Sequence, residues 1–260
     1  MLNSISIGII GNYFGHLSGA ENVKEHPLPN GIFVIHCDHP ETVTSGVEAK
    51  YPQSGTDLDI EPEFVIRFAT RYQNGRLSEL TATHMTIGND FTIRSLDGSS
   101  KISQRKAWGE KSKGINSTWW QMQEFTKANY GKNLNLISYI ERDGKFHCAT
   151  ELVDCLDTKL FHGELIEWII ERVNHQQDEG MYEEIHPEFS ANNFPEELIL
   201  YTGAPNYSGW GEENFIETGD KVHISAFKTD KYSPSEVEKR LLQGELVNDS
   251  HMLSFTQVVV

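Results

Sequence analysis

The stretch DIEPEFVIRF, residues 59–68, places two glutamates on either side of a proline, directly ahead of an apolar run typical of a β-strand. In an extended chain residues i and i+2 point to the same face, so Glu61 and Glu63 present two carboxylates side by side. Pro62 lacks the N–H that a sheet ladder needs, which predicts a strand start or a sheet rim. Two neighbouring carboxylates repel each other unless a cation lies between them. The stretch is therefore either a solvated acidic strand end or part of a site for a hard divalent ion, which takes oxygen ligands.

Strand-like segments dominate the remainder of the chain. They are separated by turns such as Asn74-Gly75 and Asp143-Gly144, in which glycine adopts a positive φ. The expected strands are residues 4–10, 31–36, 64–68, 91–94, 134–141, 198–202 and 221–227.

Two segments carry clear helix signals. In residues 159–176, apolar side chains recur at three- and four-residue spacing and predict one buried stripe, made of Phe161, Leu165, Trp168, Ile169 and Val173. In residues 233–244, Ser233 is a natural N-cap, Glu236 completes a capping box, and Gly244 ends the helix. Many strands with a few packed helices predict a β-rich α+β fold.

Composition limits the classes of function. The chain has 260 residues and a formal charge of −16, with its acidic residues dispersed along the sequence. This charge disfavours a nucleic-acid or membrane-surface partner, since both require a concentrated positive face. The N-terminus resembles a first strand rather than a signal peptide, and no segment has the apolar length of a membrane span. Three scattered cysteines, Cys37, Cys148 and Cys155, predict a reducing, cytoplasmic location without a disulfide framework.

Further polar motifs follow one another along the chain. An Asn-Asp pair ends a short apolar segment at Asp90, and Arg94 lies four residues later. Lys113 and Asn116 belong to the segment KSKGIN, residues 111–116. A Thr-Gly-Ala-Pro turn at residues 202–205 follows one strand signal, and a Gly-Asp turn at residues 219–220 precedes the last one.

This order of motifs, with GNYFGHLSGAE at residues 11–21, resembles the fumarylacetoacetate hydrolase superfamily. That family shows an N-terminal Asn-Tyr-x-x-His-x-x-Glu lid segment, a Glu-x-Glu strand and an Asn-Asp segment with an arginine four residues on. A Lys-x-x-Asp-Thr segment, a Thr-Gly-Thr-Pro turn and a Pro-Gly-Asp turn follow. The resemblance spans roughly residues 6 to 227, and we expect a bacterial branch of the superfamily. It depends on the order and spacing of the motifs, because no single one is specific.

The resemblance implies a role for each matching residue. Glu61, Glu63 and Asp90 are expected to hold one Mg²⁺ or Mn²⁺ ion. His16 is the expected general base, carried with Glu21 on a lid over residues 13–29. The alternative for His16 is an ordinary surface or core histidine.

The resemblance also implies residues that face the substrate. Lys113 is expected to neutralise a developing oxyanion or a substrate carboxylate; the alternative is a solvated lysine, in a group with Lys106 and Lys111. The expected substrate-binding residues are Arg94, Asn116, Thr202 and Gly203. Arg94 could equally be the partner of a structural ion pair.

The sequence departs from the family pattern at four positions. Asn116 stands where the family has aspartate, and Ala204 replaces the second threonine of Thr-Gly-Thr-Pro. Ser95 follows Arg94 where aspartate is usual, and Glu21 lies five residues after the histidine instead of three. These changes leave the predicted metal ligands in place and alter the predicted substrate side.

Two other motifs carry weaker signals. HCDH, residues 36–39, resembles a soft-metal cluster, but a strand turns its alternate side chains to opposite faces. The pair Trp119-Trp120 favours a place in the core or in a dimer interface over a sugar platform.

The implied fold is a mixed β-sandwich roll of the fumarylacetoacetate hydrolase C-terminal-domain type. We expect one catalytic domain over residues 1–260, with an N-terminal strand and lid in residues 1–40 and a C-terminal helix and edge strand in residues 228–260. The apolar end FTQVVV suits strand pairing or burial in a partner, consistent with a homodimer.

The expected function is metal-dependent hydrolysis of a C–C bond in an acylpyruvate, a diketo acid or another 2-oxoacid, with this small molecule as the main partner. One alternative is decarboxylation or isomerisation of a 2-oxoacid at the same metal site. Another is a non-catalytic homodimeric descendant of the fold, motivated by Asn116 and Ala204.

Overall fold

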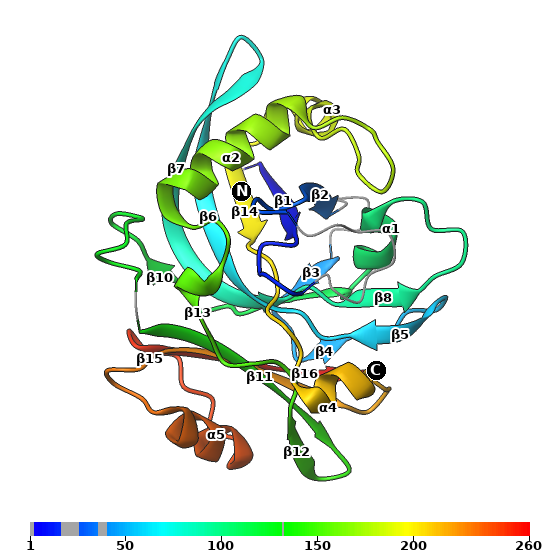
Figure 1. Ribbon diagram of the computed structural model, residues 1–260, viewed down its shortest axis with the longest axis vertical. Coiled ribbons are helices and arrows are strands. Elements are labelled where there is room, and N and C mark those ends of the chain that lie inside the picture. Colours follow the sequence, from blue (N-terminus) through cyan, green and yellow to red (C-terminus); the bar gives the residue numbers. More distant parts are fainter. Residues whose placement is uncertain (1–2, 17–25, 36–40, 132) are drawn as a thin grey trace.

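The computed structural model describes residues 3–16, 26–35, 41–131 and 133–260, which are organised around two mixed β-sheets (Figure 1). The strand order of the larger sheet is β2 (Gly31–Ile35), β1 (Ser4–Ile10), β14 (Glu197–Tyr201), β6 (Pro62–Gln73), β7 (Arg76–Asn89), β9 (Lys113–Ile115) and β3 (Val43–Thr44), with β10 (Trp120–Gln121) paired to β7. In this sheet β1 pairs with β14, and β3 with β9, in parallel, while the remaining pairs are antiparallel.

The smaller sheet lies below the larger one in Figure 1. Its strand order is β12 (Lys145–Cys148), β11 (Leu134–Arg142), β15 (Lys221–Lys228), β16 (Met252–Val259) and β4 (Glu48–Ala49), with β13 (Val153–Asp154) paired to β11. A separate ribbon joins β5 (Thr56–Asp59) to β8 (Thr92–Ser95). The C-terminal strand β16 is paired with β15 along most of its length and with β4 only at Val258 and Val259.

The main hydrophobic core fills the space between the two sheets and under helix α2 (His162–His175). Phe64, Ile66 and Phe68 alternate along β6 and are fully buried in this core. The smaller sheet contributes Leu136 and Ile224 from the opposite side. The alternation of the strand therefore turns Glu63 and Val65 away from the main core, toward the other face of the larger sheet.

The predicted helices are confirmed. In α2 the buried residues are Leu165, Trp168, Ile169 and Val173, while Phe161 precedes the helix as its N-cap. Helix α5 (Pro234–Leu242) starts after Ser233, whose side chain forms the expected capping box with Glu236. The other helical segments are α1 (Ile102–Lys106), α3 (His186–Ala191), α4 (Gly209–Glu213) and a 3-10 turn at Cys155–Asp157.

The outer face of the larger sheet is where Glu63 and Val65 point, and it carries a second apolar cluster. Phe33, Val65 and Tyr201 are buried there, and Ile102 and Ala107 pack against them from the α1 region. This packing places the short helix α1 over the outer face of the larger sheet, close to the start of β6.

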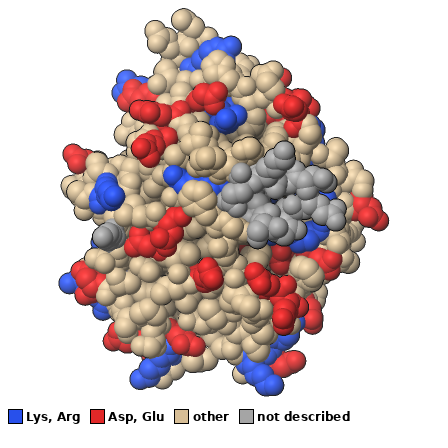
Figure 2. All heavy atoms as spheres, viewed as in Figure 1, with Lys and Arg blue, Asp and Glu red and all other residues tan. Residues whose placement is uncertain are grey.

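The fold thus has mixed sheets and few helices, which confirms the predicted β-rich α+β class. The HCDH motif and Glu21 lie outside the described residues, as does much of the predicted lid. In the described part of the chain no helix has the length and apolar composition of a membrane span. On the face shown in Figure 2 acidic side chains are spread among basic ones, in keeping with the dispersed charge of the sequence.

A candidate metal centre on the outer face of the larger sheet

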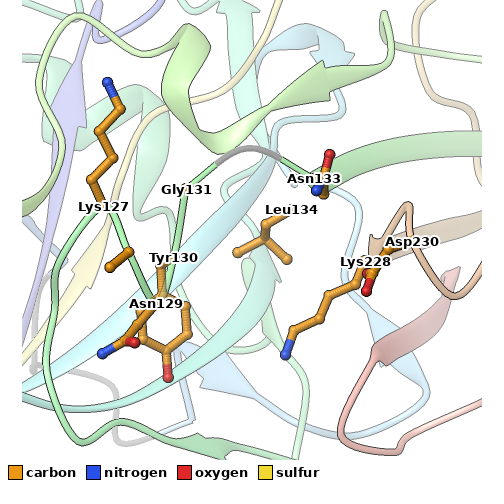
Figure 3. Close-up of a pocket in the computed structure, with 9 residues that line it drawn as sticks. Lys127, Asn129, Tyr130, Gly131, Asn133, Leu134, Lys228 and Asp230 are labelled. Atoms are coloured by element: carbon orange, nitrogen blue, oxygen red, sulfur yellow. The ribbon is translucent and has the colours of Figure 1, made fainter.

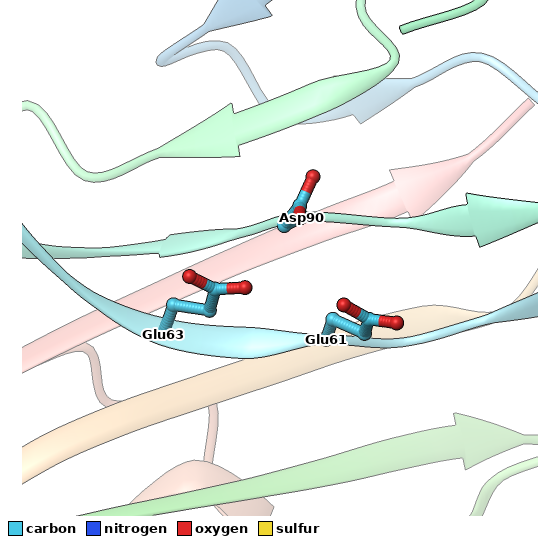
Figure 4. A group of neighbouring side chains, drawn as sticks. All are labelled: Glu61, Glu63 and Asp90. Carbon is cyan, nitrogen blue, oxygen red and sulfur yellow. The ribbon is translucent and has the colours of Figure 1, made fainter. Parts of the chain in front are cut away.

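Three buried carboxylates gather where β6 begins and β7 ends. Pro62 is the first residue of β6 and pairs with Asn89, which confirms the predicted strand start. Asp90 follows β7, and its N–H donates to the carbonyl of Glu61 at 2.8 Å. The register therefore brings Glu61, Glu63 and Asp90 together, with one oxygen of each within 4.8 Å of the others (Figure 4). All three are buried, which rules out the solvated acidic strand end.

Two glycines allow the chain to close around this centre. Gly88 faces Glu63 across the β6–β7 ladder, and a Cβ there would lie 2.6 Å from the carbonyl oxygen of Gly114 and 2.7 Å from the Tyr201 ring. Gly203 has φ +100°, and its N–H donates to Glu63 Oε2 at 2.6 Å. A larger residue at either position would push apart the segments that position the carboxylates.

Glu61 is surrounded by donors. Its Oε1 accepts hydrogen bonds from Thr92 Oγ1 at 2.7 Å and Arg94 Nη2 at 3.1 Å, and its Oε2 contacts the ammonium group of Lys106. Burial alone would raise the pKa of Glu61, but the charges of Lys106 and Arg94 hold it well below the ordinary value. Glu61 is therefore an anion at neutral pH.

Glu63 has the opposite environment. Its Oε2 accepts the Gly203 N–H, whereas its buried Oε1 has no hydrogen-bond partner among the described residues. Burial, and then the charge of Asp90, raise the pKa of Glu63 well above its ordinary value. The pKa values of these two carboxyl groups therefore shift in opposite directions, because among the described residues only Glu61 has cationic side chains in direct contact with it.

Asp90 carries a lysine on each oxygen. Lys106 Nζ lies 2.7 Å from Oδ2, and Lys113 Nζ lies 2.7 Å from Oδ1 and 2.5 Å from the Phe91 carbonyl oxygen. Lys113 is fully buried, which excludes the alternative of a solvated lysine. Burial lowers the pKa of Lys113 to about 8 even though Asp90 opposes the shift. In contrast, Lys111 is paired with the exposed Glu48 and points away from the centre.

Lys106 is the residue of the centre that sequence reasoning missed. The sequence placed Lys106 only in a group with Lys111 and Lys113, for which exposure to solvent was the alternative. A helix of five residues is too short to show an apolar stripe from which the burial of Lys106 could be predicted. Its side chain is 7 % exposed and lies between Glu61 and Asp90. A lone lysine near a predicted metal motif is too common a signal to have identified it.

His16 lies beside Glu61. Its Nδ1 is 2.9 Å from the Pro205 carbonyl oxygen, which can only accept, so Nδ1 carries a proton. The other ring nitrogen, Nε2, is 3.8 Å from Glu61 Oε1, too far for a hydrogen bond. In the neutral ring the lone pair of Nε2 therefore faces the carboxylate centre, as a general base requires.

Arg94 is held by the protein itself. Its Nε donates to Asp59 Oδ2 at 2.5 Å, and its Nη2 donates to Tyr207 Oη at 2.8 Å as well as to Glu61. This geometry favours the second of the two alternatives given for Arg94, the partner of a structural ion pair. Tyr207 also lies against His16, with ring centroids 5.7 Å apart, and no sequence motif singled it out.

The remaining predicted substrate-binding residues are engaged within the fold. Asn116 donates through its side chain to Asn248 Oδ1 at 2.8 Å and accepts from the Thr118 N–H at 3.1 Å. Thr202 is buried, and its hydroxyl donates to the Phe64 carbonyl oxygen at 3.0 Å. Gly203 touches the centre directly through Glu63. Roles for these residues in substrate binding remain predictions.

A separate hollow lies away from the carboxylates (Figure 3). It has a volume of about 200 Å³ and is lined by Lys127, Ala128, Asn129, Tyr130, Gly131, Asn133, Leu134, Lys228 and Asp230. No residue of the carboxylate centre lines it.

The residues present fit a divalent ion. Hard ions such as Mg²⁺ and Mn²⁺ take carboxylate oxygens, and three carboxylates meet here. The orphaned Glu63 Oε1 is a buried acceptor that lacks a donor, a feature that a bound cation would explain. Glu61, Glu63 and Asp90 are thus the candidate ligands.

The fold agrees with that of solved proteins over almost the whole chain. A 2-keto-3-deoxyarabinonate dehydratase matches with a TM-score of 0.61 and 16% identity, covering 100% of this chain and 75% of the other. A protein from Oleispira antarctica, provisionally assigned as a fumarylacetoacetate isomerase/hydrolase, has a TM-score of 0.60 and 13% identity, with coverages of 99% and 93%. The 5-carboxymethyl-2-hydroxymuconate delta-isomerase of Mycobacterium smegmatis has a TM-score of 0.57 and 16% identity, with coverages of 100% and 80%. The chain therefore has the fold of the fumarylacetoacetate hydrolase superfamily, as the resemblance predicted.

A family model matches the chain over most of its length. It belongs to the family described as "Family of unknown function (DUF5718)", which it matches over residues 22–259. No curated protein matches the chain. The matched range contains the three carboxylates and both lysines of the centre, while His16 and Glu21 precede it.

Proposed function

We propose that this protein is a divalent-metal-dependent enzyme that hydrolyses a C–C bond in an acylpyruvate, a diketo acid or another 2-oxoacid. The observation that carries the proposal is the buried trio of carboxylates with one orphaned oxygen, Glu63 Oε1. Glu61, Glu63 and Asp90 would hold Mg²⁺ or Mn²⁺. When bound, the ion would supply Lewis acidity toward two neighbouring oxygens of a 2-oxoacid.

The protein's own groups have defined parts in this proposal. His16 would take a proton from water at Nε2, while the Pro205 carbonyl fixes the proton on Nδ1 and so sets the tautomer. The Gly203 N–H orients Glu63, and Lys113 orients Asp90 from the opposite side of its carboxylate. Positioning of this kind keeps the ligand oxygens in place before an ion or substrate arrives.

A second candidate is decarboxylation or isomerisation of a 2-oxoacid at the same centre. Its isomerase form is favoured by the names of two structural neighbours, a delta-isomerase and a protein provisionally assigned as an isomerase/hydrolase. These reactions need no activated water. The two candidates therefore differ in what they require of His16.

Turnover on a panel of acylpyruvates and other 2-oxoacids, with Mg²⁺ or Mn²⁺ present and products identified by mass spectrometry in H₂¹⁸O, tests the proposal. Hydrolysis would place ¹⁸O in the carboxylate released on C–C cleavage. Decarboxylation would release CO₂, and isomerisation would give a product with the same number of carbon atoms as the substrate and no ¹⁸O in a newly formed carboxylate. The E61Q variant is the matched control and should lose both ion binding and turnover. An inactive wild type across the panel would refute the enzyme assignment and leave the non-catalytic descendant.

A further inference from the structure

Lys106 occupies the part of the centre where a cation is expected. Its ammonium group contacts Glu61 Oε2 and lies 2.7 Å from Asp90 Oδ2, so it bridges two of the three candidate ligands. Lys113 reaches Asp90 alone, and Arg94 reaches Glu61 alone among the three. Lys106 is therefore the cation that most nearly takes the place of a bridging metal ion.

Most of the carboxylate oxygens that a divalent ion could bind are already in contact with a donor. Each of the three carboxylates has two oxygens. Within the described residues, only Glu63 Oε1 has neither a hydrogen bond nor an ion pair, since Asp90 Oδ1 is paired with Lys113. Glu61 offers Oε1, held by Thr92 and Arg94, or Oε2, held by Lys106. An ion that takes one oxygen from each carboxylate therefore meets an oxygen that already has a donor at both Glu61 and Asp90.

Displacing Lys106 frees an oxygen on both of those carboxylates at once. Displacing Lys113 would free Asp90 only, and would also break its hydrogen bond to the Phe91 carbonyl oxygen. Lys106 in addition ends a helix of five residues, so its side chain can move without shifting a strand of the sheet. A divalent ion and an ammonium group carry like charges and repel each other. An ammonium group bound to the same two carboxylates therefore weakens the binding of the ion.

We propose that Lys106 is a tethered cation that holds the place of the divalent ion, and that ion binding displaces its ammonium group from Glu61 and Asp90. The inference rests on the metal centre of the proposed function and adds a residue of this chain that sets how tightly the ion binds. It explains how three carboxylates stay together without an ion, since the lysine offsets their mutual repulsion. It also predicts that the wild-type protein binds divalent ions more weakly than the carboxylates alone would.

Mn²⁺ binding by titration calorimetry, with free Mn²⁺ counted by electron paramagnetic resonance, tests this competition. The variants are K106M, which removes the charge and keeps an unbranched side chain one heavy atom shorter, and R105M as the matched control. Arg105 is the neighbouring residue on the same helix, and its Nε donates to Ser99 Oγ rather than to a carboxylate of the centre. Loss of one competing unit charge should lower the Kd of K106M by roughly tenfold to a hundredfold. The Kd of R105M should equal that of wild type.

Each outcome of this titration separates the competition from the metal centre itself. An unchanged or weaker Kd in K106M, with binding retained in wild type, would overturn the competition and leave the metal centre standing. If neither wild type nor K106M binds Mn²⁺, the metal centre of the proposed function is refuted, and the competition with it. If K106M binds Mn²⁺ and wild type does not, the competition is supported, and Lys106 then keeps the ion out of the wild-type centre.

Because K106M removes a buried charge, its fold must be checked, and a second measurement uses the wild type alone. In crystals soaked with Mn²⁺, the anomalous signal locates the ion and the map locates the Lys106 side chain. We expect the ion among Glu61, Glu63 and Asp90 with Nζ moved off Glu61 Oε2. An ion bound there while Lys106 still contacts both carboxylates would overturn the proposal.

Discussion

Replacing Glu63 and Glu61 by glutamine should have opposite effects on stability, although the two residues are only two positions apart and belong to the same carboxylate centre. Glu63 has an orphaned oxygen and a raised pKa, whereas Glu61 has three donors and a lowered pKa. E63Q removes a carboxyl group that resists ionisation in the folded state. E61Q removes an anion on which Lys106 and Arg94 depend.

The sign of the pH effect follows from the direction of each shift. The folded pKa of Glu63 lies above its unfolded value, so wild type loses stability as pH rises from the unfolded pKa to the folded one. E63Q lacks this loss. The free energy of unfolding of E63Q should therefore rise relative to that of wild type by about 1.4 kcal/mol per pH unit between the unfolded and the folded pKa of Glu63. The folded pKa of Glu61 lies below its unfolded value, so its contribution is fully present above the unfolded pKa. E61Q should therefore show a nearly constant deficit at neutral and alkaline pH.

These energies convert to melting temperatures through the size of the chain. With about 2.1 cal/mol/K of unfolding entropy per residue, 260 residues give about 550 cal/mol/K, so 1 kcal/mol shifts Tm by about 2 °C. The Tm of E63Q should rise relative to wild type by about 2–3 °C per pH unit inside the window. Breaking the buried pairs of Glu61 costs about 3–5 kcal/mol and should lower Tm by about 5–9 °C.

Scanning calorimetry between pH 5 and pH 9, in EDTA to remove divalent ions, provides the measurement. Wild type and the two variants should be scanned at the same ionic strength. The reasoning is refuted if both variants shift Tm in the same direction, or if the difference between E63Q and wild type does not depend on pH.

Three further outcomes follow from the structure. H16Q should lower kcat by roughly 10²–10⁴-fold and leave the Mn²⁺ Kd unchanged, as loss of a general base alone would; full turnover in H16Q would favour a reaction that needs no activated water. Gly203 has φ +100°, and in G203A the added Cβ would lie 2.9 Å from the Cβ of Asn12, so the variant should lose about 1–3 kcal/mol of stability. Calorimetry measures this loss, and an unchanged Tm would contradict the close packing. S233A removes the N-cap of α5 and should cost about 1 kcal/mol, or about 2 °C in Tm; no loss would show that the capping box does not stabilise the helix.

Local patterns accounted for the features of this protein that depend on neighbours in sequence. The buried stripe of α2 and the capping box of α5 were predicted because helix periodicity and capping act within a few residues. The same holds for Glu61 and Glu63, since strand alternation alone puts i and i+2 on one face. Asp90 was added through a resemblance, and the β6–β7 register supplies its physical reason.

Only the tertiary structure decided how these groups are charged and partnered. Lys106 is 45 residues from Glu61 and 16 from Asp90, and it reaches both because α1 packs on the outer face of the larger sheet. Tyr207 meets Arg94 across 113 residues of sequence. The strand pattern alone makes Glu61 and Glu63 equivalent, yet their pKa values shift in opposite directions, because desolvation and charge depend on which distant side chains surround each oxygen.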